Sequence, residues 1–201
     1  SEGVGVSIKH FAVNNQETNR MSINEVVSER ALREIYLSAF EYVVKNSDPW
    51  TVMSSYPKIN GTHGAQNKYL LTDILKNEWK FNGLVMSDWF AVKDAVAAVN
   101  AGNDLIMPGG PKWGGQGDTS DDVLAGLKNG TIKEADIDKN IKNILKIVLK
   151  SLSFKGDLPT NKPDLKANVE IVRKTAAEGM VLLKNEKTLP IQNNVKLALF
   201  G

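Results

Sequence analysis

The 201-residue sequence contains no cysteine and two histidines. Without cysteine there can be no disulfides, no thiolate catalysis and no cysteine-based metal site. The lack of cysteine does not identify the cellular compartment, and secreted, periplasmic and cytoplasmic locations are all compatible with the sequence. His10 and His63 lie far apart in the sequence and show no ligand spacing, so we expect no metal and no cofactor.

Other signals are also missing. The 25 Lys and Arg residues nearly balance 23 Asp and Glu, and no basic block stands out, so we expect no nucleic-acid partner. No apolar run approaches the roughly 20 residues that span a bilayer, so no membrane partner is expected. No charged-then-apolar leader opens the chain, and its first residues are typical of the middle of a protein. The stretch Gly114-Gly115-Gln-Gly117 lacks the Lys-Ser/Thr ending of a phosphate loop and is predicted to be an ordinary loop.

Short apolar runs rich in β-branched residues alternate with longer stretches of helical period. This pattern predicts an α/β fold with a parallel sheet. The composition, 42% hydrophobic, is sufficient for one sizeable core. The predicted strands are residues 5–11, 51–56, 83–87 and 104–107.

A helix is predicted after the first strand from apolar residues at 27, 31, 35, 39 and 43, flanked by 32, 36, 40 and 44. Ser22 and Glu25 form a capping-box pattern at its start. Thr131 and Glu134 repeat the pattern before the last of four further helices, and Asn129-Gly130 is a stop signal before it. These four helices are predicted over 68–79, 91–101, 121–128 and 134–152.

The pattern changes after residue 152. Residues 153–166 hold prolines and polar residues without a period, which indicates a linker. A helix over 167–185 and a strand over 195–200 are then predicted. We therefore expect a first domain at 1–152, a linker at 153–166 and the start of a second α/β domain at 167–201.

Polar side chains stand at the ends of three predicted strands: Lys9-His10, Tyr56, and Ser87-Asp88-Trp89. Parallel strands all end at one edge of a sheet, so these groups should converge there. Asp88 could be a nucleophile toward a sugar's anomeric carbon, or it could cap the helix that follows.

The neighbouring residues also allow two interpretations each. Trp89 could be a sugar platform or a core aromatic. Lys9, His10 and Arg20 could donate hydrogen bonds to sugar hydroxyls, or could be ordinary surface and structural residues. Tyr56 could hydrogen-bond the nucleophile, or could be an amphipathic lid.

Several stretches together resemble glycoside hydrolase family 3, in particular its β-glucosidases. They are Lys-His-Phe-Ala-Val-Asn-Asn-Gln-Glu at 9–17, Met-Ser-Ser-Tyr at 53–56, Gly-Leu-Val-Met-Ser-Asp-Trp at 83–89 and Ala-Gly-Asn-Asp-Leu-Ile-Met-Pro-Gly at 101–109. Residues 176–185 and 189–191 resemble that family's entry into its second domain. The N-acetylhexosaminidase branch fits less well, because it typically has Pro-Gly-His-Gly where this sequence has Ala-Val-Asn-Asn after Phe11.

The resemblance implies the C-terminal half of a TIM-like (β/α)8 barrel, followed by a linker and the first helix and strand of an α/β sandwich. It implies retaining hydrolysis of β-linked sugars with Asp88 as nucleophile. Lys9, His10 and Arg20 would be sugar ligands, Tyr56 a neighbour of the nucleophile and Trp89 a wall of the subsite. The acid/base would lie beyond Gly201, and the missing parts of the polypeptide would be needed to complete the fold. The 201 residues by themselves are then expected to fold poorly and turn over little.

Two other classes of protein stay open. One is a barrel lyase or aldolase in which Lys9 forms a Schiff base with a carbonyl substrate. The other is a non-catalytic carbohydrate-binding fragment.

Overall fold

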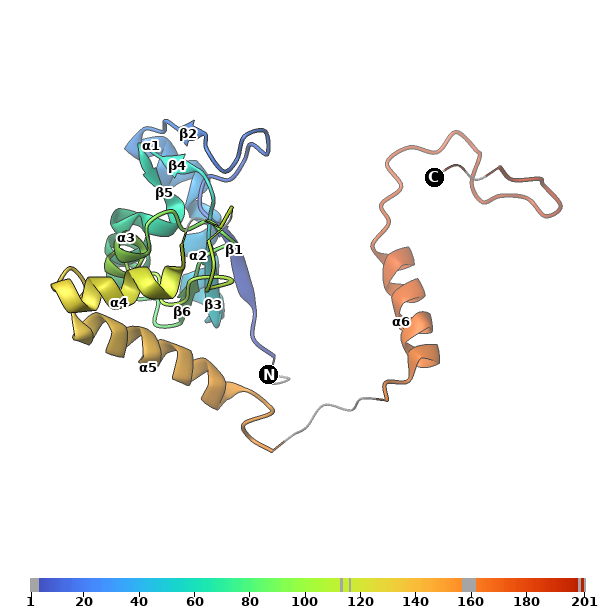
Figure 1. Cartoon of the computed structure of the whole chain (residues 1–201). Coiled ribbons are helices and arrows are strands. Elements are labelled where there is room, and N and C mark those ends of the chain that lie inside the picture. Colours follow the sequence, from blue (N-terminus) through green and yellow to red (C-terminus); the bar gives the residue numbers. More distant parts are fainter. Residues whose placement is uncertain (1–3, 113, 116, 157–161, 199, 201) are drawn as a thin grey trace. The chain divides into compact units, whose positions relative to one another are not determined.

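The structure, a computed structural model, describes residues 4–112, 114–115, 117–156, 162–198 and 200 (Figure 1). The chain divides into two compact units, Ser1–Leu158 and Pro159–Gly201. Each is described by itself.

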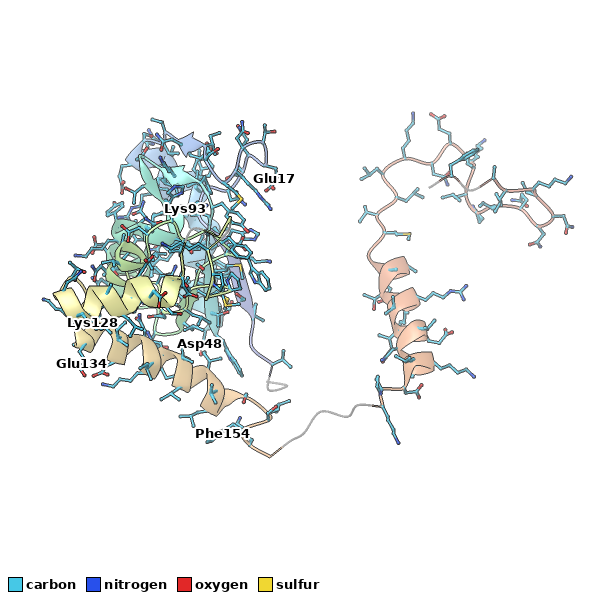
Figure 2. The ribbon with its side chains drawn as sticks, in the orientation of Figure 1. Glu17, Asp48, Lys93, Lys128, Glu134 and Phe154 are labelled. Atoms are coloured by element: carbon cyan, nitrogen blue, oxygen red, sulfur yellow. The ribbon has the colours of Figure 1, made fainter. Side chains whose placement is uncertain are left out.

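The main sheet of the first unit is parallel. Its strands β1 (Ser7–Phe11), β3 (Thr51–Ser54) and β6 (Leu84–Met86) lie in the order β1-β3-β6. The prediction of an α/β fold with a parallel sheet is therefore confirmed, with three of the four predicted strands in place. In Figure 2 the loops that follow the strands, marked by Glu17 and Lys93, lie at the end of this unit opposite to Asp48.

The fourth predicted strand, 104–107, does not form as a strand of its own. A single parallel bridge joins Leu105 to Met86. The backbone N–H groups of Asp104 and Leu105 both donate to the carbonyl of Val85, at 2.8 and 3.1 Å. The N–H of Val85 donates to the Asp104 carboxylate, at 2.9 Å, rather than to a main-chain carbonyl. A side chain thus interrupts the regular ladder.

A small second sheet was not predicted. It consists of β2 (Asn24–Glu25), β4 (Lys58–Ile59) and β5 (Thr62–His63), with β2 and β4 parallel and β4 and β5 antiparallel. Two-residue strands are too short to show a hydrophobic period. The sequence signal for the hairpin is Asn60-Gly61, since both residues have positive φ, 49° and 94°, as the tight turn requires.

The first helical segment begins later than the capping box predicts. Glu25 belongs to β2, and the segment consists of α1 (Glu29–Ala31), the π-helical η1 (Leu32–Tyr36) and α2 (Ser38–Ser47). The predicted apolar stripe is confirmed for one row, 32, 36, 40 and 44, which packs in the core. It is wrong for Ile35, which is 65% exposed.

Ser28 is the N-cap, because its hydroxyl accepts the N–H of Ala31 at 3.2 Å. We expect Ser28→Ala to lower the free energy of unfolding by about 1 kcal/mol, since it leaves an N–H of the first turn without its acceptor. Thermal unfolding followed by circular dichroism measures the change. Ser22→Ala is the control, with an expected change within about 0.5 kcal/mol. A larger loss at Ser22 than at Ser28 would contradict the reassigned cap.

Four of the remaining helical segments of the first unit lie where helices were predicted, although α3 begins four residues later than the predicted 91, and the 3-10 turn η2 was not predicted. The segments are η2 (Gly64–Gln66), the π-helical η3 (Tyr69–Glu78), α3 (Ala95–Asn100), α4 (Thr119–Asn129) and α5 (Glu134–Lys150). Gly130, at φ 78°, ends α4 as predicted. The predicted capping box before α5 is wrong, because the Thr131 hydroxyl donates to the Asn129 side chain at 2.7 Å instead.

The core lies between the parallel sheet and its helices. Phe11, Val52 and Val85 come from the three strands and are fully buried. They pack against leucine and isoleucine side chains of η1 and η3. Each such side chain contributes roughly 1.5 to 3 kcal/mol by leaving water. A second cluster of Tyr56, Ala65 and residues of α3 lies beyond the ends of β3 and β6, and it supports the loops described below.

In the second unit α6 (Leu165–Glu178) is present, capped by Asp164, but it ends seven residues before the predicted 185. The strand predicted over 195–200 is absent from described residues 195–198 and 200. A strand needs a neighbour to satisfy its backbone groups, and no strand pairs with these residues. Residues 157–161 of the predicted linker lie outside the described ones. Among the described helices, none has the length and apolarity to cross a membrane.

Candidate active site

Asp88 lies directly after β6, where the chain turns away from the sheet. The residue is 9% exposed. Its Oδ1 accepts the backbone N–H of Trp89 at 2.7 Å, and its Oδ2 lies 3.3 Å from Nε2 of His10. The carboxylate is thus held from one side by its own turn and meets β1 on the other.

The alternative role of Asp88, capping the following helix, is wrong. The N-cap of α3 is Asp94, whose side chain accepts the N–H of Ala97 at 2.9 Å. Asp88 lies six residues before that cap. Its carboxylate is therefore available for another purpose.

Tyr56, just beyond β3, is the second neighbour of this carboxylate. Its hydroxyl donates to the carbonyl of Trp89 at 2.9 Å. Burial raises the pKa of the Tyr56 phenol, and the negative charge of Asp88 raises it further. Tyr56 therefore stays a neutral hydrogen-bond donor at physiological pH.

Arg20 reaches this group through the tyrosine ring. Its guanidinium carbon lies 4.8 Å from the ring centroid of Tyr56, and its Nη1 donates to Glu17 at 2.7 Å. A guanidinium at this distance from an aromatic face is a cation–π contact. Arg20 is therefore anchored beside the site.

His63 was interpreted from the sequence as an ordinary loop residue, yet it supports the site. Its Nδ1 lies 3.0 Å from the carbonyl of Tyr56, so Nδ1 carries the hydrogen. Burial lowers the pKa of His63, which keeps the ring neutral. The only sequence signal for this placement was the Asn60-Gly61 turn before β5.

Trp89 and Lys9 are the remaining predicted site residues. Trp89 is 54% exposed, which excludes the core-aromatic alternative, and its ring meets Phe90 edge-on with centroids 6.2 Å apart. Lys9 is exposed and lines a hollow along β1 beside α2. The structure therefore brings His10, Tyr56, Asp88 and Arg20 together and leaves the Lys9 side chain with no ion pair to this group among the described residues.

In the part of the chain that the structure describes, no three His, Cys, Asp or Glu side chains are placed to hold a metal ion. The chemistry of the group is that of one carboxylate with a histidine and a phenol beside it, followed in the chain by an exposed indole. Such a set can offer a nucleophilic oxygen and hydrogen-bond donors to a polar, ring-shaped ligand.

The family model of the glycosyl hydrolase family 3 N-terminal domain matches residues 1–147. The chain belongs to this family.

Relatives agree with the assignment. Thermostable β-glucosidase B of Acetivibrio thermocellus is 43% identical over 202 residues, covering 100% of this chain and 26% of that protein. An exo-α-(1→6)-L-arabinopyranosidase of Bifidobacterium longum is 43% identical over 189 residues, covering 94% of this chain and 24% of that protein. The structure of β-glucosidase 3B from Thermotoga neapolitana in complex with glucose matches with a TM-score of 0.89 and 49% identity, over 99% of this chain and 28% of that one. The chain thus spans about a quarter of the length of the curated relatives it matches.

Proposed function

We propose that the chain is the nucleophile-bearing part of a retaining β-glycosidase of the β-glucosidase type. The observation that carries the proposal is the group at the strand ends, in which the Asp88 carboxylate faces His10 and lies beside Tyr56 in a chain of this family. A largely buried carboxylate with donors around it suits attack on an anomeric carbon.

In the proposed mechanism an oxygen of Asp88 forms a bond to C1 of the sugar while the bond from C1 to the leaving oxygen breaks. A general acid protonates that oxygen, and water later opens the covalent glycosyl-enzyme. The acid would come from outside this chain and lie about 5 to 5.5 Å from Asp88, as retention requires. His10, Arg20 and Lys9 would bind sugar hydroxyls, and Trp89 would stack on the ring.

We also propose that these residues form half of a TIM-like barrel, which other parts of the polypeptide would complete. Among the described residues β1 pairs only with β3, which leaves one edge of the sheet open. At the other side α5 exposes an apolar stripe, with Ile141, Leu145 and Leu149 each about half exposed. An open strand edge and an uncovered apolar stripe are both features that a complete barrel would bury. We therefore expect the isolated 201 residues to be weakly active at most.

Labelling with a 2-deoxy-2-fluoro-β-glucoside that carries a dinitrophenyl leaving group tests the proposal. The complete polypeptide that contains these residues should gain one fluoroglucosyl group, located by peptide mass spectrometry at Asp88. The fluorine slows the second step, so the adduct accumulates. Labelling at another carboxylate would reject Asp88 as the nucleophile. Borohydride trapping of a carbonyl substrate on Lys9 would favour the lyase instead, and saccharide binding without any adduct would favour a binding fragment.

The identity of the sugar substrate is a separate question. The two relatives described above are both 43% identical to this chain, yet one is named as a β-glucosidase and the other as an arabinopyranosidase. The arabinopyranosidase motivates a second candidate substrate, an α-L-arabinopyranoside. Comparing kcat/KM for nitrophenyl β-D-glucopyranoside and nitrophenyl α-L-arabinopyranoside decides between the two. We expect the glucoside to be preferred, since the other relative and the structural match are both β-glucosidases.

A further inference from the structure

The main chain around Asp88 is held by the segment 104–107. The N–H of Ser87 donates to the carbonyl of Leu105 at 2.9 Å, and the N–H of Phe90 donates to the carbonyl of Met107 at 3.0 Å. These two bonds lie on either side of Asp88, whose main-chain carbonyl accepts the N–H of Ala91 at 3.2 Å and whose Oδ1 accepts the N–H of Trp89 at 2.7 Å. The position of the carboxylate therefore depends on where residues 104–107 lie.

Ser87 sets that position with its side chain. The residue is fully buried, and its Oγ accepts the N–H of Met107 at 2.8 Å. A regular parallel ladder would give this N–H to a main-chain carbonyl. Here the acceptor is the Ser87 hydroxyl, and removing that hydroxyl would leave the N–H of Met107 without its acceptor.

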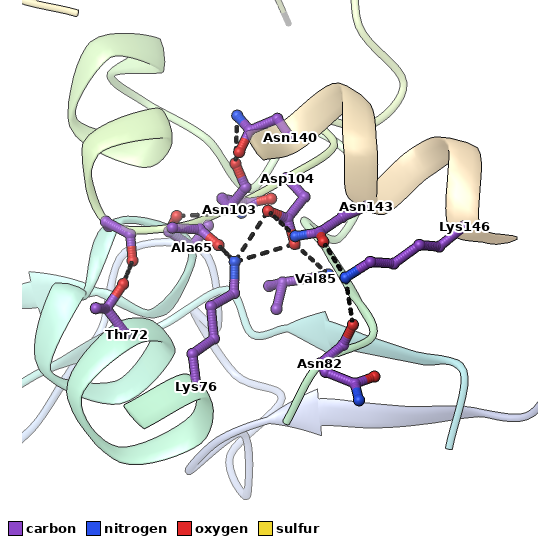
Figure 3. Close-up of polar contacts among 12 residues, drawn as sticks. Ala65, Thr72, Lys76, Asn82, Val85, Asn103, Asp104, Asn140, Asn143 and Lys146 are labelled. Atoms are coloured by element: carbon purple, nitrogen blue, oxygen red, sulfur yellow. Dashed lines mark hydrogen bonds and ion pairs between the residues drawn. The ribbon is translucent and has the colours of Figure 1, made fainter. Parts of the chain in front are cut away.

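Asp104 anchors the other end of the same segment (Figure 3). Its buried carboxylate accepts the N–H of Val85 at 2.9 Å, Nζ of Lys76 at 2.9 and 3.0 Å, and Nδ2 of Asn143 at 3.0 Å. Because η3, β6 and α5 each supply one of these donors, Asp104 cannot shift without all three elements. The segment is thus fixed at Asp104 and transmits its position to the turn through Ser87.

We propose that Ser87 is a positioning residue for Asp88, acting through the anchored segment 104–107. The inference rests on the proposed function, since it supposes that Asp88 attacks a sugar. Attack needs the carboxylate oxygen in line with C1 at close range, and a misplacement of about 1 Å can cost about a hundredfold in rate. A ground-state sugar, held by its hydroxyls, is far less sensitive to that shift.

Ser87→Ala in the complete polypeptide tests this. We expect the rate constant for labelling by the fluoroglucoside to fall about tenfold to a hundredfold, while the inhibition constant of glucose stays within about twofold. Ser54→Ala is the matched control, because Ser54 is also a fully buried serine at a strand end and its hydroxyl accepts Nδ2 of Asn103 at 3.5 Å. It should label at the wild-type rate. Ser87→Cys, which keeps a weak acceptor of similar size, should lie between Ser87→Ala and wild type.

A wild-type labelling rate in Ser87→Ala would overturn the inference. So would a parallel loss of glucose affinity and labelling with a lowered melting temperature, because that is the pattern of general destabilisation. Absence of labelling in the wild-type polypeptide would instead reject the proposed function, so the two failures are distinguishable.

Discussion

Asp88→Ala is expected to lower kcat/KM for a nitrophenyl β-glucoside by at least about 10⁴-fold, the scale on which enzymes lose activity with their nucleophile. The reason is chemical, since alanine offers no oxygen to C1 and the covalent intermediate cannot form. Affinity for glucose should change little. Steady-state kinetics of the complete polypeptide with its Asp88→Ala variant measures both quantities.

Azide makes this experiment sharper. In Asp88→Ala a small anion can enter the space that the carboxylate leaves, and its nitrogen can bond to C1 as the nitrophenolate departs with the electron pair of the broken bond. We expect added azide to restore turnover and to yield the glycosyl azide of inverted configuration. This product would not form if Asp88 had only a structural role.

Asp94→Asn is the matched control for Asp88→Ala. Asp94 lies on the same loop, is exposed, and caps α3 through one oxygen that asparagine retains. We expect kcat/KM within about twofold of wild type. Equal losses in Asp94→Asn and Asp88→Ala would reject the nucleophile assignment.

The second large effect is on stability. Asp104→Ala is expected to lower the free energy of unfolding by about 3 to 5 kcal/mol, as breaking a buried ion pair does. It leaves the Lys76 ammonium, whose side chain is 15% exposed, without its carboxylate, and it leaves the N–H of Val85 without its acceptor. Urea unfolding of the complete polypeptide, followed by tryptophan fluorescence, measures the change.

The double variant Lys76→Met with Asp104→Asn tests the cause. It removes both charges and retains an acceptor for Val85, so it should be less destabilising than Asp104→Ala. Glu34→Gln, which breaks an exposed pair with Arg30, should cost about 0 to 1 kcal/mol. A double variant no more stable than Asp104→Ala would contradict the role assigned to the buried pair.

The pH dependence of Asp104→Ala has a defined sign. Burial lowers the pKa of Lys76 below its ordinary 10.5, and Asp104 is the group that raises it again. The pKa of Lys76 is therefore below 10.5 even in the wild type, and removing Asp104 lowers it further, so the folded variant binds fewer protons than the folded wild type over a window below pH 10.5. Stability of Asp104→Ala should therefore rise relative to wild type as the pH rises through this window.

The sequence by itself determined the α/β class, the three parallel strands and most of the helices, because hydrophobic period and stop signals such as Gly130 act over a few residues. It also identified the polar groups that follow the strands, since parallel strands all end at one edge. The family resemblance, confirmed over residues 1–147, came from local motifs of the same kind.

The tertiary structure decided what depends on contacts between distant segments. Local patterns allowed Asp88 to be a cap, placed the first helix start at Ser22 and gave residues 104–107 a strand of their own. In the fold Asp94 takes the cap, β2 pairs with β4, and the Asp104 carboxylate bonds to Val85 in place of a ladder carbonyl. The meeting of His10 with Asp88, 78 residues apart in sequence, likewise follows from the order of strands in the sheet. Each of these outcomes depends on which of several possible hydrogen-bond or strand partners a residue meets in the fold. The residues next to it in sequence do not determine that choice.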